Sequence, residues 1–509
     1  MEFMNNQNGR LNQPQEQPAN NQIPQTESVL VDIPDAIEES SHKKRKICEA
    51  EVWQGIRDEL VEVRIESFSP AGNECSCCSR EIENIIWCPD CGPNSVYCNN
   101  CNEYIHRVVQ YHQSFIWKND VSLFVPVFRE ASLAQWHVCD TTYCRKITVF
   151  DALGRPHTVA ANFCSCESEA ATLLRHGLWP ATPSKPQTAF NIELMETCRV
   201  LQLEGHVSLQ KFCNAASKRI NFMPHLRNST NLYKALGNSL LEFHHHQVKC
   251  LEIAQAPDIV GKNCPVCTMK PERAVFSMDA NFGLVHKMHS GSGPGLEHAR
   301  FSLFSPDEEV KSFVNAHYEA TSKSKNSSSD CSNFQAGDVV RSKNRSARLD
   351  IKGVFGAICH HGFPVHIVNM QHGERFGYPV YILKKIAASQ AGTMHTKQTV
   401  MYDVACGLDA HLKRHSQLTE RLNDKVRLVV PIFHSFAHGA KCQMTYGQRF
   451  SEGTALIDGE GMERLWSYLR RFSYTKEMTL PNRQDLLSSA FLHYARRNFC
   501  PLPRHWVQD

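Results

Sequence analysis

The chain has 509 residues, enough for roughly two to four domains with at least one sizeable core. Hydrophobic residues make up 42%, charged residues 21%, and the formal net charge is +3, so bulk charge does not indicate a nucleic-acid partner and any DNA-binding surface must be a local patch. No apolar run approaches the roughly 18 residues of a membrane span, and the Asn/Gln-rich N-terminus is unlike a secretory signal peptide, so we expect no membrane partner. The chain has 22 cysteines, and those in Cys-x-x-Cys pairs are therefore expected to bind zinc rather than to form disulfides.

Residues 1–50 are rich in Asn, Gln, Pro, Ser and Glu. Such a composition cannot bury a core, and we expect this tail to be disordered. Near its end lies the basic cluster of residues 43–46, with the sequence KKRK. A basic cluster on a flexible arm suits a nuclear import receptor or a phosphate backbone and predicts localisation in the nucleus; a solvated charge run is the alternative.

Residues 51–185 are predicted to form a zinc-binding module. Three Cys-x-x-Cys pairs and two histidines fall within residues 75–112. A Cys-x-x-Cys turn places two thiolates on one side of a tetrahedral ion, so eight ligands make two closed structural sites. An interleaved arrangement assigns Cys75, Cys78, Cys98 and Cys101 to one zinc ion, and Cys88, Cys91, His106 and His112 to the other. Cys77 stays open as an alternative for either of its neighbours.

A second, looser cysteine group follows in the same module. Residues 136–159 alternate around a turn at residues 153–156, which predicts a β-hairpin. Cys164 and Cys166 come directly after this hairpin and could close on Cys139 and Cys144 as a further zinc site. Two buried thiols beside a reactive pair are the alternative.

Residues 186–262 carry leucines near helical spacing and are predicted to be a helical connector. The histidine triplet at 244–246 is a poor metal site, because adjacent residues of a helix face different ways. Residues 263–509 form the third predicted region. At about 289–350 it is interrupted by Gly/Ser/Lys-rich sequence, which predicts a long mobile surface insertion.

Three short apolar motifs of this third region each carry an acid: Asp279 in FSMDANFGL, Asp403 in MYDVACGLDAH, and Glu460 with Glu463 in IDGEGMERLWSYL. Each acid alone has an ordinary interpretation, as a turn residue, a helix N-cap or a partner of a helix dipole. Together they follow the order strand, strand, helix. In this order an RNase H-like nuclease presents carboxylates to two divalent ions, which predicts Mg²⁺ or Mn²⁺ as the catalytic cofactor.

Cysteines and histidines recur close to these acids. His434, His438 and Cys442 are spaced by four residues, and on a helix they would share one face, either to bind zinc or to contact phosphate beside the acids. Basic residues crowd the last motif and could contact DNA phosphates, or else form a solvated face. These residues are Arg464, Arg470, Arg471, Lys476 and Arg483.

Cys264 and Cys267 form a single knuckle before the first acidic motif. The knuckle could pair with Cys359 and His361 as a zinc site. For this knuckle, as for the histidine motif, the alternative is a buried cysteine and a capped histidine.

As a set, these motifs resemble the Kyakuja-Dileera-Zisupton (KDZ) transposases. The resemblance rests on NCPVCTMKPERAVFSMDANFGL, GVFGAICHHGFP with GERFGYPVYIL, YDVACGLDAHLKRH, PIFHSFAHGAKCQMTYG and DGEGMERLWSYLRRFSYTKEMTLPNRQDLL. Residues of about 60–185 look like the cysteine cluster that accompanies these transposases. The resemblance covers most of the chain beyond residue 50.

The resemblance implies a multidomain α+β protein, with a zinc-stapled cysteine-rich N-terminal module followed by an RNase H-like α/β catalytic domain with insertions. It implies a DDE triad of Asp279, Asp403 and either Glu460 or Glu463, since both glutamates lie in the matching segment. The implied activity is metal-dependent DNA cleavage and strand transfer at transposon ends, with DNA as partner and self-association. The alternative is an inactive, domesticated or truncated transposase-derived zinc protein that binds DNA or proteins, because the spacing of residues 75–112 also resembles a B-box.

Overall fold

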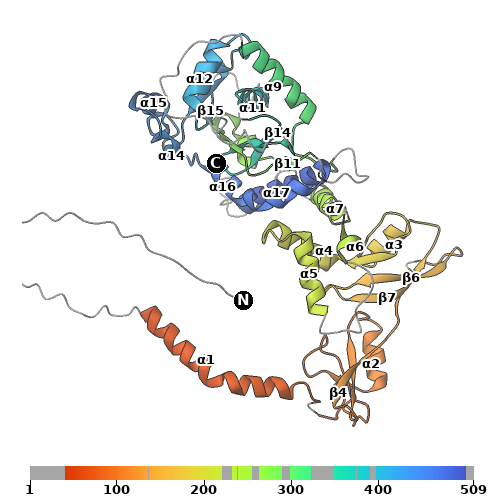
Figure 1. The fold of residues 1–509 in the computed structure, drawn as a ribbon. Coiled ribbons are helices and arrows are strands. Elements are labelled where there is room, and N and C mark those ends of the chain that lie inside the picture. The colour runs from red at the N-terminus through yellow and green to blue at the C-terminus, as the bar shows by residue number, and fades with distance from the viewer. Residues whose placement is uncertain are drawn as a thin grey trace, which may run out of the picture.

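The computed structural model describes residues 41–499, apart from 71, 136, 221–231, 238, 255–262, 289, 291–298, 323–347, 374 and 390–396. Figure 1 shows a separate N-terminal helix, two small regions that contain strands, and a larger region formed by the last part of the chain. None of the helices in these described ranges is long and apolar enough to cross a lipid bilayer.

The N-terminal helix α1 (Ser41–Glu66) includes the basic cluster. The prediction of a disordered tail is therefore wrong for residues 41–50, and residues 1–40 lie outside the described part. Helix-forming Lys, Arg, Glu and Ala residues dominate the first turns of α1, and within the helix no Pro or Gly occurs before Gly55. Both features favour a helix. Most of its side chains are exposed, including the apolar Trp53 and Val61.

The first small region contains an antiparallel sheet of order β2-β1-β3-β4 and one helix. Its buried apolar core is small, with Ile82, Tyr97 and two of the cysteines at its centre. A core of this size stabilises a fold weakly unless metal ions or disulfides hold it together. The elements are β1 (Ile86–Trp87), β2 (Val96–Tyr97), α2 (Asn99–His106), β3 (Ser114–Lys118) and β4 (Leu123–Val127).

The second small region contains a five-stranded sheet of order β5-β7-β6-β9-β8. The predicted hairpin is confirmed, because β6 and β7 pair antiparallel from Tyr143↔Phe163 to Phe150↔Pro156. In its turn, Arg155 forms buried ion pairs with Asp151 (2.6 Å) and with Asp90 (2.8 Å), which links this sheet to the first region. The elements are β5 (Ala131–Leu133), β6 (Tyr143–Phe150), β7 (Pro156–Phe163), α3 (Glu169–Arg175), β8 (Leu178–Pro180) and β9 (Thr188–Asn191).

Four helices follow this second sheet: α4 (Ile192–Leu203), α5 (Leu209–Ile220), α6 (Leu232–Leu236) and α7 (Ser239–Ala254). The leucines of the helical pattern are mostly buried, among them Leu194, Leu203 and Leu236. Helix α7 packs against α4 and also against α17 of the last region, so it connects the two.

The last region is built on a mixed sheet of order β14-β13-β10-β15-β16. β13 pairs antiparallel with both β10 and β14, whereas β10, β15 and β16 run parallel. The sheet strands are β10 (Val275–Asn281), β13 (Gly353–Cys359), β14 (Pro364–Met370), β15 (Gln398–Met401) and β16 (Val426–Val429).

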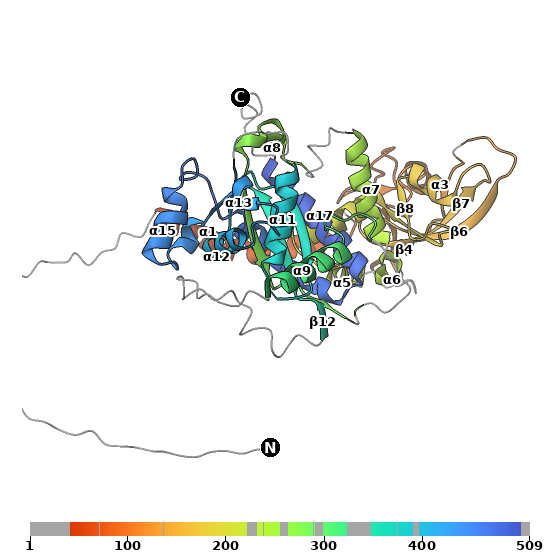
Figure 2. The same ribbon diagram turned by 90° about the horizontal axis from the view of Figure 1, so that it is seen from above.

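Helices cover both faces of this sheet. One face packs on α9 (Asp307–Ser322), α11 (Gly377–Ser389) and α12 (Ala405–Arg414), and the other on α16 (Gly461–Leu469) and α17 (Leu480–Phe499). Seen from above in Figure 2, α9, α11 and α12 lie over the sheet. The remaining elements are α8 (Pro265–Met269), β11 (His286–Lys287), β12 (Leu349–Ile351), α13 (Leu422–Lys425), α14 (Ile432–Ser435), α15 (Ala440–Tyr446) and the 3₁₀ helices at Pro271–Arg273, Gln448–Phe450 and Arg470–Glu477 (η6).

The predicted mobile insertion at 289–350 is wrong for residues 307–322, which form α9. Val310 and Val314 lie one turn apart on this helix and are buried in the core beneath α11. Three consecutive acids, residues 307–309, occupy its first turn, where they complement the helix dipole. These two signals indicate a helix, but the Gly/Ser/Lys-rich sequence on either side of it obscured them. Residues 323–347 lie outside the described part.

Burial of His244 makes the stability of the chain sensitive to acid. His244 lies on α7, fully buried, and burial lowers its pKa to about 3, helped by nearby Arg199 and Arg496. An unfolded histidine titrates near 6.5, so below about pH 6.5 only the unfolded chain takes up this proton. The free energy of unfolding should then fall by about 1.4 kcal/mol for each pH unit, an effect that replacement of the imidazole removes.

We therefore expect wild type to lose about 1 kcal/mol more than His244→Met when the pH falls from 6.5 to 5.5, because the unfolded imidazole is already half protonated at pH 6.5. Urea unfolding of both proteins at the two pH values measures the difference, and acid release of bound metal is common to both. His42→Met, at an exposed position of α1, is the control and should behave as wild type. Equal slopes for wild type and His244→Met would contradict this assignment.

Candidate active site and metal centres

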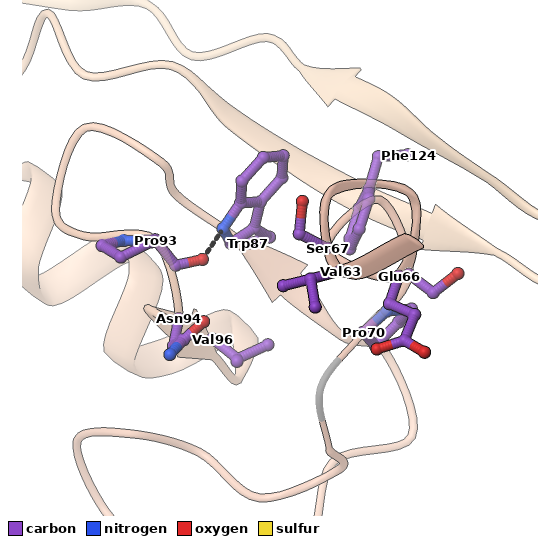
Figure 3. Close-up of a pocket in the computed structure, with 10 residues that line it drawn as sticks. Val63, Glu66, Ser67, Pro70, Trp87, Pro93, Asn94, Val96 and Phe124 are labelled. Atoms are coloured by element: carbon purple, nitrogen blue, oxygen red, sulfur yellow. Dashed lines mark hydrogen bonds between the residues drawn. The ribbon is translucent and has the colours of Figure 1, made fainter. Parts of the chain in front are cut away.

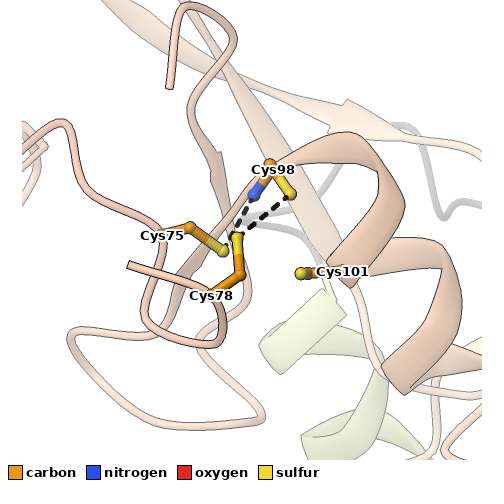
Figure 4. Close-up of side chains that lie close together, drawn as sticks. All are labelled: Cys75, Cys78, Cys98 and Cys101. Atoms are coloured by element: carbon orange, nitrogen blue, oxygen red, sulfur yellow. Dashed lines mark hydrogen bonds between the residues drawn. The ribbon is translucent and has the colours of Figure 1, made fainter. Parts of the chain in front are cut away.

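The first cysteine cluster lies where the chain enters the first small sheet. Cys75, Cys78, Cys98 and Cys101 bring their sulfur atoms within 4.8 Å of one another (Figure 4). The Cys98 backbone N–H also donates to Cys75 Sγ at 3.4 Å. This is the first set of four in the interleaved arrangement, and it could hold zinc. Cys77 is exposed and lies outside the cluster.

The second cluster gathers Cys88, Cys91, His106 and His112. His106 Nε2 lies 3.2 Å from Cys88 Sγ, and His112 Nδ1 lies 3.3 Å from Cys91 Sγ. The other ring nitrogen of His106, Nδ1, lies 2.6 Å from the Asn102 carbonyl oxygen and donates to it. A backbone carbonyl that orients a histidine in this way is typical of metal-binding histidines. This cluster, too, could hold zinc.

The third cluster differs from the predicted one. The structure gathers Cys139, Cys164 and Cys166 with His137, whereas Cys144 is exposed on β6. The predicted fourth ligand was wrong because Cys144 already belongs to the β6–β7 ladder, opposite Asn162. The pattern His137-x-Cys139, which mirrors Cys164-x-Cys166, is the signal that could have identified the right ligand.

The fourth cluster joins the Cys264–Cys267 knuckle to Cys359 and His361, the partners considered from the sequence. His361 Nδ1 lies 3.4 Å from Cys264 Sγ and 3.3 Å from Cys267 Sγ. Cys359 ends β13 and pairs with Phe276 near the start of β10. The cluster therefore fastens the segment before β10 to the β13–β14 turn, at the opposite end of β10 from Asp279.

His434, His438 and Cys442 do not share a helical face. The helix breaks between α14 and α15, and His438 lies in the turn between them. His438 and Cys442 instead gather with Cys406 of α12, a ligand that sequence reasoning missed. His438 Nδ1 lies 3.5 Å from Cys406 Sγ and 3.4 Å from Cys442 Sγ.

The four candidate acids occupy the positions expected from the sequence. Asp279 lies half-buried on β10, the central strand, and Asp403 follows β15 by two residues. Glu460 is the N-cap residue of α16, and Glu463 lies in the first turn of that helix. Elements distant in sequence therefore carry these acids toward one side of the sheet.

Parallel pairing of β10 and β15 brings together the segments that precede two of these acids. β10 and β15 pair in parallel through Val275↔Thr399, Phe276↔Val400 and Ser277↔Met401. Asp279 lies two residues beyond this paired segment on β10, and Asp403 lies two residues beyond it in the turn that follows β15.

The face of β10 that carries Asp279 meets the start of α16. Ser277 shares that face, because strand residues alternate, and its hydroxyl donates to the Gly459 carbonyl at 2.9 Å. Gly459 is tightly enclosed, since a β-carbon there would lie 2.7 Å from Met401 Sδ. The backbone immediately before Glu460 therefore packs against both acid-bearing strands.

His434 interacts electrostatically with three of the acids. His434 Nε2 lies 3.2 Å from Glu463 Oε1 and 3.9 Å from Glu460 Oε2. The hydrogen bond with Glu463, together with the charges of Asp403 and Glu460, raises the pKa of His434, and the same bond lowers the pKa of Glu463. Burial raises the pKa of both Asp403 and Glu460. Partly desolvated carboxylates gathered around one imidazole are a donor set that suits a hard divalent ion.

The two glutamates differ in exposure. The Glu460 side chain is 17% exposed and accepts from the Phe433 backbone N–H at 3.2 Å. The Glu463 side chain is 50% exposed. Glu460 therefore lies deeper in the acid cluster.

Basic residues near the last motif are only partly available to a ligand. Arg464, Arg470 and Arg471 are exposed, although Arg464 pairs with Asp458 at 2.5 Å. Arg483 is fully buried and donates to Asn369 Oδ1 (2.9 Å) and to the Leu284 carbonyl (2.7 Å). The prediction that Arg483 could contact phosphate is therefore wrong: it binds other parts of the fold together.

A pocket of about 470 Å³ lies away from the acids, between the end of α1 and the first small sheet (Figure 3). Trp87, whose Nε1 donates to the Pro93 carbonyl at 2.8 Å, lines it together with Val63 and Phe124. Glu66 is the one titratable side chain in its lining, so this pocket does not offer catalytic chemistry.

A mixed sheet that carries candidate acids, preceded by Cys/His clusters that could hold metal ions, defines an α+β protein with a cysteine-rich N-terminal region. Residues 272–494 match the model of the Kyakuja-Dileera-Zisupton transposase (KDZ) family. Residues 134–223 match the CxC2 like cysteine cluster associated with KDZ transposases. The chain therefore contains a KDZ transposase domain and, before it, the cysteine cluster associated with such domains. Comparison with curated proteins found no match, and comparison with solved structures found none either.

The two family matches include some of the candidate sites and leave others outside. All four acids lie inside the transposase match, and the third metal cluster lies inside the cysteine-cluster match. Residues 75–112, with the first two clusters, lie outside both matches. The sequence predicted that residues of about 60–185 resemble the associated cysteine cluster. The match covers only the second half of that stretch, and it continues through the helices α4 and α5.

We expect Cys78→Ser to lose one zinc ion per chain, because three ligands remain in the first cluster. Cys77→Ser, one residue earlier and exposed, should keep the zinc content of wild type. Elemental analysis of the two purified variants distinguishes them. Equal zinc contents would contradict the ligand set.

Ser277→Ala should loosen the start of α16, because a buried carbonyl loses its donor. The local free energy of opening should fall by about 1–3 kcal/mol. Hydrogen exchange of peptides that span residues 455–466 measures the effect. Ser473→Ala, at an exposed position of η6, is the control and should leave this exchange unchanged. Unchanged exchange in Ser277→Ala would contradict the role of the hydrogen bond.

Proposed function

We propose that the chain is a DDE-type DNA transposase that cleaves DNA and transfers strands at transposon ends with Mg²⁺ or Mn²⁺. The observation that supports this proposal is the grouping of Asp403, Glu460 and Glu463 around His434, together with the hydrogen bond from Ser277, two residues before Asp279, to the backbone before Glu460. The KDZ transposase domain supports a transposase-related function.

The sheet supports the RNase H-like part of the proposal. Numbered along the chain, its strands lie in the order 3-2-1-4-5, with the first three antiparallel and the last two parallel to the first. Helices cover both faces. A central strand with an acid, a parallel neighbour with a second acid and a later helix with a third are the arrangement that the proposal requires.

Asp279, Asp403 and Glu460 are proposed as the ligands of the divalent ions. When bound, such ions activate a water or a 3′ hydroxyl and stabilise the charge that develops on the phosphate. Glu460 is favoured over Glu463 because it is more buried and because Glu463 is paired with His434. His434 lies between the glutamates, and it can orient Glu463 or hold a phosphate oxygen beside the ions.

The partners follow from the same proposal. DNA is the substrate, and the exposed Arg470, whose charge adds to the hydrogen bond with His434 in lowering the pKa of Glu463, can take a phosphate beside the acids. The exposed basic residues 44–46 of α1 support nuclear localisation. Self-association is included because strand transfer must hold two transposon ends together.

A second candidate is a transposase-derived zinc protein that binds DNA or proteins without cutting. It is favoured by the compact module at 75–112, whose two closed clusters lie outside both family matches. Closed four-ligand sites stabilise a binding surface and supply no chemistry. Both candidates bind zinc, so only the acids discriminate between them.

The test is a nicking and strand-transfer assay with Mn²⁺ on a DNA end of the matching element. Asp279→Asn, Asp403→Asn and Glu460→Gln should each lower the rate by at least about 100-fold, because each removes a charged ligand of the ions. Glu463→Gln should cost less. Asp458→Asn, a neighbouring exposed acid paired with Arg464, is the matched control.

If wild type cleaves and the three variants cleave equally well, the proposed site is wrong. If wild type neither cleaves nor binds Mn²⁺ in calorimetry, the non-cutting zinc protein is supported instead.

A further inference from the structure

A cluster of three potential metal ligands contacts the backbone of Asp403, the second of the candidate acids. Cys406 of α12, His438 of the α14–α15 turn and Cys442 of α15 bring their ligand atoms within 4.8 Å of one another. Two elements that are separate in sequence thus meet at these side chains. No other Cys, His, Asp or Glu of the described residues belongs to this group.

The orientation of His438 is the one a metal would select. Its Nδ1 faces the two sulfur atoms, while its Nε2 lies 2.9 Å from the Asp403 carbonyl oxygen and donates to it. This tautomer leaves the lone pair on Nδ1 for a metal ion. His106 of the second cluster has the same arrangement, with one nitrogen toward cysteines and the other toward a backbone carbonyl.

A second contact brings the same two helix faces together. Tyr446, one turn after Cys442, donates from its hydroxyl to Asp409 Oδ2 at 2.7 Å, and Asp409 lies one turn after Cys406. Residues three or four apart share a helical face, so α12 and α15 contact each other through the faces that carry the thiols. The approach of the ligands therefore does not depend on one flexible side chain.

The cluster also joins the two flanks of the acid site. On one side, His438 holds the Asp403 carbonyl. On the other, the segment just before His438 contacts the glutamates, through the Phe433 N–H to Glu460 and His434 to Glu463. An ion bound by Cys406, His438 and Cys442 would fix the distance between Asp403 and the glutamates.

We propose that Cys406, His438 and Cys442 bind a zinc ion that positions the acid cluster, with water in the fourth coordination position. Two thiolates and one imidazole form a ligand set that zinc prefers over the hard ions of the acids. His438 acts as a positioning residue, through Asp403. The role in positioning rests on the proposed function, whereas the zinc site itself does not.

The test counts zinc in the full chain by elemental analysis and measures Mn²⁺ binding by calorimetry. With five clusters occupied, wild type should hold about five zinc ions and Cys406→Ser about four. Cys250→Ser is the matched control: Cys250 is exposed on α7 with His246 at 3.6 Å, outside the five clusters, and should retain the full zinc content. Mn²⁺ affinity should fall about tenfold or more in Cys406→Ser, as for other residues that orient metal ligands.

The outcomes separate this inference from the proposed function. Unchanged zinc in Cys406→Ser overturns the site. Loss of zinc with unchanged Mn²⁺ affinity overturns its positioning role. Asp403→Asn should lose Mn²⁺ binding and keep all zinc; if wild type binds no Mn²⁺, the proposed function fails while the zinc count still decides the site.

A measurement on wild type covers the case in which Cys406→Ser does not fold. Substitution with ¹¹³Cd distinguishes sites by their number of thiolates, because each thiolate shifts the resonance. The proposal requires a two-thiolate resonance that correlates with a single imidazole, in contrast to the second cluster, which has two imidazoles. Absence of that resonance overturns the inference.

Discussion

The parallel pairing of β10 with β15 is the constraint on which the acid site depends. Residues 275–277 and 399–401 align by backbone hydrogen bonds, and Asp279 and Asp403 each follow this aligned segment by two residues, although more than a hundred residues separate them in sequence. A slip of one residue would turn the side chains of β15 to the other face. The register is held by burial, because Phe276, Met278 and Val400 fill the core under α11 and α12.

Buried polar contacts extend this constraint to the rest of the domain. Ser277 connects β10 to the start of α16, and Arg483 of α17 connects β14 to the chain after β10. Burial lowers the pKa of Arg483 to about 10, so it still carries its charge at neutral pH, balanced by nearby Asp307. Charges buried in this way are costly to leave unpaired, and such contacts therefore specify one arrangement of helices on the sheet. The cysteine clusters serve the same purpose where the apolar core is small, as in residues 75–127.

Much of the site chemistry was predictable from local pattern. The Cys-x-x-Cys pairs, the hairpin at Gly154 and the acids at the ends of apolar runs are signals within a few residues. The errors arose where a residue's role depends on distant neighbours. Cys144 lies on a strand, and its pairing with the neighbouring strand keeps it out of the third cluster. Whether Arg483 is exposed or buried depends on the packing of the whole domain. His434 does not join His438 and Cys442 because the helix breaks between α14 and α15. The helix α9 was missed because its two buried valines lie within polar sequence.

The sequence alone determined the kinds of ligand along the chain: thiolates and imidazoles in the N-terminal module, then acids in the order strand, strand and helix, with further cysteines and histidines between them. Those features are local, because ligand type and apolar runs are written in neighbouring residues. Only the tertiary structure decided which side chains share a site, bringing His137 to the third cluster, Cys406 to His438 and His434 to the glutamates. Proximity across a sheet depends on strand register and helix packing, which are fixed by the burial of the whole core and not by any single segment.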